Sequence, residues 1–205
     1  MKILHLMAHG GVGGAERLVI SMVGGLIDRG HDATLVNAWT DSPLNAAASA
    51  AGIPFVALRG GTRRIGFRWL REVGRYLRGH RFDIVHAHGL RVSVGLRSLR
   101  RRMGNARHVM TVHGLDRQRT SLQTLIDRAT EHRVDRVVCV SRAVVEKRRS
   151  VARTPASKLV VIPNGVDLQA FSPGLEPPTR ESLGLPTGFL ESDGVGGSRV
   201  VYRGD

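Results

Sequence analysis

The segment HGGVGGAERL, residues 9 to 18, is rich in glycine and follows a short apolar run. Gly13 and Gly14 stand directly before a stretch with helical periodicity. Glycine lets a ligand approach the backbone closely, and the amides at a helix N-terminus favour an anion. We therefore predict that Gly13 and Gly14 form a phosphate-binding loop. A tight turn that binds nothing is the alternative interpretation.

Two better-known phosphate motifs fit this loop poorly. No Lys-Ser or Lys-Thr pair follows a glycine at the spacing that a P-loop requires. The dinucleotide fingerprint begins with Gly11 and Gly13, but Glu16 stands where its third glycine should be. The next apolar run ends without the acidic residue that would hold a ribose. A general anion site at the helix start is therefore the prediction.

Polar side chains follow several other apolar runs of the chain: His9, His86, His88, His113, Ser141 and Arg142. If these runs are parallel strands, their carboxyl ends meet at one edge of the sheet, where ligands bind in open α/β folds. We predict that His113 takes part in catalysis or orients hydroxyl groups, and that His88 and Arg142 line the cleft. A solvated helix start is the alternative for Arg142, and simple packing is the alternative for His86.

A metal centre is not predicted at these histidines. His86 and His88 are two residues apart and would share a face of a strand, and His113 could join them. No carboxylate or cysteine completes a ligand set with them, so we expect no metal. From its position alone, Glu16 is an acid in the first turn of a helix, where the helix dipole favours it.

Alternating elements must position these residues. Continuous apolar runs typical of buried parallel strands occur at 2–7, 33–38, 53–57, 82–87, 107–112, 136–140 and 158–162. Amphipathic stretches typical of helices occur at 15–29, 65–79, 90–102, 120–133 and 142–150. This alternation predicts a doubly wound, mostly parallel α/β sheet of Rossmann type.

The domain organisation follows from a change of composition near residue 171. We predict one α/β domain over residues 1–171 and a Pro/Gly/Ser-rich linker over 172–198. Residues 199–205 then look like the first strand of a further domain. The 205 residues and their 41% apolar content are enough for one substantial core.

The chain is strongly basic, with 31 Lys and Arg against 17 Asp and Glu. Such an excess attracts phosphates or anionic surfaces, and a compositional preference for arginine on solvated surfaces is the alternative. Aromatic residues are scarce and no nucleic-acid motif occurs, so nucleic acid is not an expected partner. The single cysteine, Cys139, lies in an apolar run and cannot form an intrachain disulfide. Without a signal peptide or an apolar stretch of about 20 residues, we expect a cytoplasmic protein, peripheral at the inner face of a membrane.

One predicted helix supports that membrane interpretation. In RRIGFRWLREVGRYLRGH the arginines recur at spacings of four and three, and they are Arg64, Arg68, Arg71, Arg75 and Arg78. Apolar residues occupy the opposite face. A basic amphipathic helix suits an anionic membrane surface. The alternative is an outer helix whose apolar face packs on the sheet.

Several segments of the chain share a resemblance to one protein family. Five segments occur in this order along the chain: GGVGGAERL, DIVHAHG, TVHG, VCVSRAV and VIPNGVDLQAFSP. Together they resemble the N-terminal half of retaining glycosyltransferases of family four, which have the GT-B fold. The resemblance covers residues 1 to 173. Spacing and composition alone predict only an α/β phosphate-binding domain.

The resemblance implies an acceptor-binding domain that faces a donor-binding domain across a cleft. It implies that Gly13 and Gly14 approach the donor diphosphate, that Glu16 reaches acceptor or loop groups, and that His113 lies near the transferred sugar. Asn164, Gly165 and Asp167 match a turn that leads to the interdomain crossing, with Asn164 at the cleft. The family uses a nucleotide sugar as co-substrate, with no bound metal or other cofactor.

Three functional hypotheses remain open at this point. The chain is the acceptor-binding half of a glycosyltransferase that acts on a glycan or lipid-linked acceptor, and a separate C-terminal half is a candidate partner. Alternatively it is a non-catalytic module that binds phosphate or sugar, or it is an inactive remnant. The basic and glutamate-rich motifs of the family's donor domain do not occur in these residues, so we expect the chain to end before that domain.

Overall fold

The computed structural model describes residues 1–8, 11–40, 42–58, 67–114, 120–166 and 168, together with strands at 189–192 and 198–201. The chain divides into two compact units, Met1–Gly165 and Val166–Asp205. In the first unit the strands are β1 (Lys2–Met7), β2 (Asp32–Asn37), β3 (Phe55–Ala57), β4 (Ile84–His88), β5 (Arg107–Val112), β6 (Arg136–Cys139) and β7 (Leu159–Val161).

Its α-helices are α1 (Gly14–Ile27), α2 (Pro43–Ala50), α3 (Phe67–Gly79), α4 (Leu90–Ser98), α5 (Ser121–Thr130) and α6 (Arg142–Lys147). Short helical turns follow α4, α5 and α6 and precede β7, and they are η1 (Arg100–Met103), η2 (Glu131–Arg133), the π-helical η3 (Arg148–Ala152) and η4 (Ala156–Lys158). The predicted strands and helices are therefore present, with ends that differ by a few residues.

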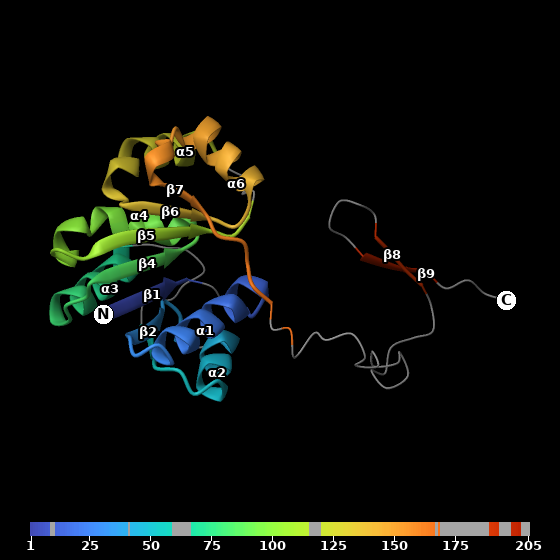
Figure 1. Cartoon of the computed structure of the whole chain (residues 1–205), viewed down its shortest axis with the longest axis horizontal. Helices are drawn as coiled ribbons and strands as arrows, with labels where there is room; N and C mark the ends of the chain where they lie inside the picture. The colour runs from blue at the N-terminus through green and yellow to red at the C-terminus, as the bar shows by residue number, and fades with distance from the viewer. Residues whose placement is uncertain are drawn as a thin grey trace. The chain divides into compact units, whose positions relative to one another are not determined.

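The seven strands form one parallel sheet in the order β3-β2-β1-β4-β5-β6-β7 (Figure 1). This confirms the doubly wound α/β fold. The chain starts in the middle at β1, proceeds to one edge at β3, and then crosses to β4 on the other side of β1. The order of the strands therefore reverses between β1 and β4, where such sheets bind their ligands.

Helices cover the two faces of the sheet, and alternate strand residues explain which helices pack where. Leu4 and Leu6 of β1 belong to a core cluster with Trp69 of α3 and Leu96 of α4. Ile3 of β1 belongs to a second cluster that includes residues of α1 and α2. Consecutive residues of β1 thus face different helical layers, as expected for a strand that is buried on both sides.

Helix α2 was not predicted from the sequence. Its residues PLNAAASA are alanine-rich and lack a strong apolar stripe, so periodicity did not reveal them. The local capping signal was present, because the Ser42 hydroxyl accepts a hydrogen bond from the Leu44 amide at 3.2 Å and Pro43 occupies the first turn.

A buried ionic network joins α4, α5, η2 and η3. The Asp127 carboxylate accepts hydrogen bonds from Arg97 at 2.7 Å and from Arg148 at 2.6 Å. The same two guanidinium groups also contact the Glu131 carboxylate, Arg97 at 3.1 Å and Arg148 at 2.8 Å. The Thr154 hydroxyl donates to the other carboxylate oxygen of Glu131 at 2.6 Å. Two cations and two anions therefore balance one another inside the unit.

The second unit contains β8 (Phe189–Ser192) and β9 (Ser198–Val201), which pair antiparallel. Strand β8 falls inside the range 172–198 that is predicted to be a linker, and β9 overlaps the strand predicted at 199–205. The remaining residues of both ranges lie outside the described part of the chain. The domain boundaries therefore stay a prediction.

Candidate functional site

A cavity of about 450 Å³ opens at the carboxyl ends of β1, β4 and β5, beside the reversal of strand order. Three segments line it. They are the end of β1 with the first turn of α1, the β4–α4 turn, and the end of β5 with the residues that follow it. Glu16, His88 and His113, three of the predicted site residues, are among the lining residues. The structure thus brings together side chains that lie almost 100 residues apart.

The glycine loop lies beside this cavity and is open to a ligand. Gly13 precedes α1 with φ −117°, and Gly14 is the first residue of the helix, so neither backbone conformation requires glycine. Both residues are exposed. A Cβ atom at Gly14 would meet no other atom within 4 Å. The protein itself therefore does not need glycine at position 14, which favours a ligand as the reason for it.

Glu16 has a structural contact as well as a place in the cavity wall. Its carboxylate is buried and accepts a hydrogen bond from the Gly13 amide at 2.8 Å. This contact ties the glycine loop to the first turn of α1, where the helix dipole favours an acidic group. Both interpretations of Glu16 are therefore compatible with the structure.

The β4–α4 turn requires its glycine. Gly89 has φ +88° and ψ 155°, a backbone region that is essentially limited to glycine. Its amide donates to the Thr111 carbonyl at 2.9 Å. This turn ends β4 directly after His88, which leaves the His88 side chain in the cavity wall. The segment HAHG therefore both positions this histidine and begins α4.

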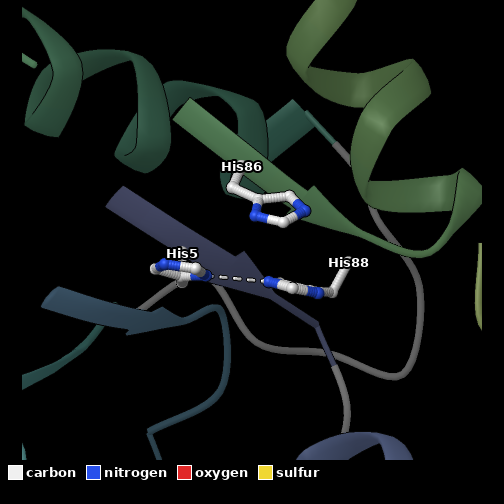
Figure 2. A group of neighbouring side chains, drawn as sticks. All are labelled: His5, His86 and His88. Atoms are coloured by element: carbon white, nitrogen blue, oxygen red, sulfur yellow. Dashed lines mark hydrogen bonds between the residues drawn. The ribbon is translucent and has the colours of Figure 1, made fainter. Parts of the chain in front are cut away.

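Histidines form a chain of contacts inward from the cavity. His113 Nε2 lies 3.1 Å from His88 Nδ1, and His88 Nε2 lies 3.0 Å from His5 Nδ1. His86 Nε2 lies 2.7 Å from the Thr111 hydroxyl. Figure 2 shows His5 on β1 and His86 and His88 on β4, with the three rings close to one another.

Strand register explains this gathering. His5 pairs with His86 across the parallel β1–β4 ladder, so both side chains point to the same face of the sheet. His88 follows two residues later on the same strand and face. Sequence reasoning grouped His86 and His88 but missed His5, because the pairing of β1 with β4 is a non-local contact. Position 5 inside an otherwise apolar strand was the available signal.

Burial keeps these imidazoles neutral. It lowers the pKa of His5 to about 4 and holds the pKa values of His86 and His88 well below the ordinary 6.5. Burial also lowers the pKa of the half-buried His113, while the Glu16 carboxylate opposes that shift. At neutral pH a neutral His113 can accept a proton or a hydrogen bond from a hydroxyl group.

The other predicted site residues lie outside the cavity wall. Arg142 is exposed on the first turn of α6, and Asn164 is exposed after β7. Neither is among the residues that line the cavity. His9 and Asp167 fall outside the described residues, as does Arg64 of the basic segment. The assignment of Arg142 and Asn164 to a cleft therefore remains a prediction.

Helix α3 packs its apolar face in the core and exposes arginines on its other face. Trp69, Val73 and Leu77 are buried in the core, so its apolar face packs on the sheet. Four arginines are exposed, and these are Arg68, Arg71, Arg75 and Arg78. Arg75 contacts Glu72 at 2.7 Å, and Arg71 lies 3.9 Å from the same carboxylate. Among the described residues, no helix is long and apolar enough to cross a membrane.

Comparisons with known proteins support the fold and identify the family. The model of Glycosyltransferase Family 4 matches residues 12–170, which is most of the chain. Anabaena HepE, solved in complex with UDP and glucose, has a TM-score of 0.73 at 20% identity, with 90% of this chain and 50% of that chain covered. No curated protein sequence matches significantly.

Two further solved structures share the fold. A glycosyltransferase from Rickettsia africae gives a TM-score of 0.70 at 21% identity, over 91% of this chain and 50% of that one. UDP-N-acetylglucosamine 2-epimerase from Rickettsia bellii gives 0.62 at 14% identity, over 91% and 52%. The chain thus spans about half the length of these structures.

Proposed function

The chain belongs to glycosyltransferase family 4 and has the fold of the N-terminal half of a GT-B enzyme, and on this premise we propose that it is the acceptor-binding half of a nucleotide-sugar-dependent glycosyltransferase. The observation that carries the proposal is the cavity at the strand-order reversal, which is lined by Glu16, His88 and His113 and bordered by an exposed glycine loop.

The glycine loop is the proposed contact to the donor diphosphate. Exposed backbone at Gly13 and Gly14, at the N-terminus of a helix of 14 residues, offers amide donors and a favourable dipole to an anion. Anabaena HepE was solved with UDP and glucose. We therefore propose a nucleoside diphosphate sugar as co-substrate, and no cofactor or metal ion on the diphosphate.

His113 is the proposed residue at the reacting groups. As a neutral imidazole in the cavity wall, it can accept a hydrogen bond from a hydroxyl group of the acceptor or of the transferred sugar. Glu16 and His88 would shape the same wall, and Arg142 and Asn164, which lie outside this cavity, would contact the acceptor beyond it. In keeping with the family resemblance, we propose transfer with retention of the anomeric configuration.

A complete active site would need a second wall. The departing diphosphate requires cationic groups aimed at its developing charge. The chain spans about half the length of the solved structures that it resembles. We propose that a C-terminal half, in the same polypeptide or separately encoded, supplies those groups. Nucleic acid has no part in this proposal.

An anionic membrane surface is the proposed location of the acceptor. The exposed arginines of α3 project from a helix whose apolar face is already used in the core. They can therefore contact lipid headgroups by charge without inserting the helix. We propose a cytoplasmic protein at the inner face of a membrane, acting on a glycan or lipid-linked acceptor.

The first test is a thermal-shift titration of the chain with UDP, UDP-sugars and inorganic pyrophosphate. A ligand that binds only the folded state raises the midpoint by mass action. We expect a shift with UDP that Gly14→Val abolishes, because the valine side chain would occupy the space of the diphosphate. Gly79→Val is the matched control, since a Cβ at Gly79, at the end of α3, also meets no atom within 4 Å.

The variants separate the outcomes of that titration. A wild-type shift that persists in Gly14→Val and Gly79→Val alike would contradict the role of the loop. No shift with any ligand from a folded chain would contradict donor binding by this half.

A second candidate is a binding module that holds a phosphorylated sugar without transferring it. It is favoured by the cavity being formed entirely within the first unit. Binding that survives while the chain, mixed with a C-terminal half, transfers no sugar to any acceptor would support this alternative.

A further inference from the structure

Three buried histidines form a cluster next to the cavity, and one of them, His88, also lines the cavity wall. His5, His86 and His88 each offer a ring nitrogen, and these nitrogens all lie within 4.8 Å of one another. Their side chains are only 1%, 9% and 4% exposed. We propose that this cluster binds a divalent transition-metal ion of the zinc type through three neutral imidazoles.

Hydrogen bonds orient the rings as a metal site requires. If His86 Nε2 donates to Thr111 at 2.7 Å, the lone pair of His86 lies on Nδ1. If His88 Nδ1 donates to His113 at 3.1 Å, the lone pair of His88 lies on Nε2, toward His5. Metal-bound histidines commonly use their second nitrogen in this way to fix the tautomer.

His5 supplies the third nitrogen. Its Nδ1 lies 3.0 Å from His88 Nε2, whereas its buried Nε2 has no hydrogen-bond partner among the described residues. Two nitrogens at about 2.0–2.1 Å from a tetrahedral zinc ion are about 3.3 Å apart. A shift of a few tenths of an ångström would therefore bring this pair to the spacing of two zinc ligands. The His86 nitrogen, which lies within 4.8 Å of the other two, would have to approach them by up to about 1.5 Å.

The donor set and the surroundings of the three rings also favour a metal. Their donor set of three nitrogens suits Zn²⁺, Co²⁺ or Cu²⁺ rather than Mg²⁺ or Ca²⁺. Because His88 also lines the cavity, an ion could reach the cluster and keep one coordination position open to that side.

An ion at this cluster would act on the candidate catalytic histidine. Coordination through His88 Nε2 leaves the proton on His88 Nδ1, so His113 Nε2 must accept the hydrogen bond. The proton of His113 then lies on Nδ1. Metal occupancy would thus select one tautomer of His113, although metal binding itself does not depend on the proposed transfer activity.

The test uses the untagged, chelator-treated chain and Co²⁺ as a spectroscopic substitute for Zn²⁺. We expect one equivalent of Co²⁺ to bind with the intense visible absorption of a low-coordinate site, and Zn²⁺ to displace it. His5→Gln and His86→Gln should each weaken binding at least about tenfold, which corresponds to about 1.4 kcal/mol. His108→Gln should bind like wild type, because His108 is equally buried but lies outside the cluster.

Absence of a stoichiometric Co²⁺ complex, or equal affinity of the His5→Gln and His108→Gln variants, would overturn the proposal. X-ray absorption of the zinc-loaded wild-type chain gives an answer even if a variant fails to fold. We expect three imidazole ligands at about 2.0 Å. One or two imidazoles would indicate a surface site instead and would equally refute the cluster as a zinc site.

Discussion

Glu16 and His113 face the same cavity, and their electrostatic coupling can be measured directly. Burial lowers the pKa of His113, and the negative charge of Glu16 opposes this shift by favouring the protonated ring. Glu16→Gln removes the charge, so we expect the pKa of His113 to fall further. The measurement is a pH titration of the His113 ring nitrogens by NMR.

Glu146→Gln is the matched control for that titration. Glu146 is an exposed acid on α6 that lies 3.8 Å from Arg149 and does not line the cavity. It should leave the His113 titration unchanged. An unchanged or raised His113 pKa in Glu16→Gln would show that the two side chains are not coupled as the structure indicates.

The two faces of helix α3 have different roles. Its buried Trp69, Val73 and Leu77 stabilise the core, whereas the exposed arginines are free of that task. We expect Gln at positions 68, 71, 75 and 78 together to leave the thermal midpoint nearly unchanged. The same variant should lose most of its binding to vesicles with anionic lipid, at about 1 kcal/mol per arginine near the surface.

Cosedimentation with vesicles at low and high salt is the appropriate measurement. A variant with Gln at Arg100, Arg101, Arg107 and Arg136 removes the same four charges from other elements and serves as the comparison. Equal loss of binding in both variants would indicate that general basicity, rather than α3, drives membrane contact. No vesicle binding by wild type would refute the proposed membrane location.

The ionic network between α4, α5, η2 and η3 should dominate the stability of that side of the unit. Asp127→Asn leaves the buried Arg97 and Arg148 with Glu131 as their remaining anion. Removing one partner of a buried ion pair costs about 3–5 kcal/mol. We expect a loss of that size in urea denaturation. Glu146→Gln, which breaks the exposed ion pair of Glu146 and Arg149, should lower the free energy of unfolding by less than about 1 kcal/mol.

The pH dependence of this network has a definite sign. Burial alone would raise the pKa of Asp127, but hydrogen bonds and charges from Arg148 and Arg97 outweigh it and hold the pKa below the ordinary 3.8. The stabilisation is therefore complete above pH 3.8 and is lost as the pH falls through the folded-state value. A loss in Asp127→Asn of less than about 1 kcal/mol would contradict this account.

The whole unit should lose stability in mild acid because its interior holds neutral histidines. Burial and the Arg97 charge lower the pKa of His108 from 6.5 to about 4. Between these values the unfolded chain binds a proton that the folded chain does not. Stability is therefore complete above pH 6.5 and falls toward pH 4, by up to about 1.4 kcal/mol per pH unit for one histidine.

Denaturation curves between pH 7.5 and about 4.5, recorded with a chelator, test this expectation. In His108→Gln the slope of unfolding free energy against pH should decrease by about one histidine's contribution. His5, with a pKa lowered to about 4, adds to the slope in the same direction and remains in the variant. A slope equal to that of wild type would show that His108 is not held neutral by the fold.

The sequence by itself determined the alternation of strands and helices, because apolar runs and amphipathic stretches are local patterns. It also singled out Gly13, Gly14, His88 and His113 as candidates, since glycine-rich turns and polar residues at strand ends are visible without a structure. Family segments distributed over the chain then indicated a glycosyltransferase half, and the family match confirmed this. Helix α2 was not predicted, because its alanine-rich sequence shows little hydrophobic periodicity.

Only the tertiary structure decided which residues meet. The pairing of β1 with β4 places His5 opposite His86, a contact between residues 81 positions apart that no local pattern contains. The partners of Arg97 likewise come from α5 and η2. Arg142 appeared equivalent to His113 as a polar residue after a strand, yet only His113 reaches the cavity. Local periodicity specifies the elements, whereas strand order and register, which depend on the whole buried core, specify the site.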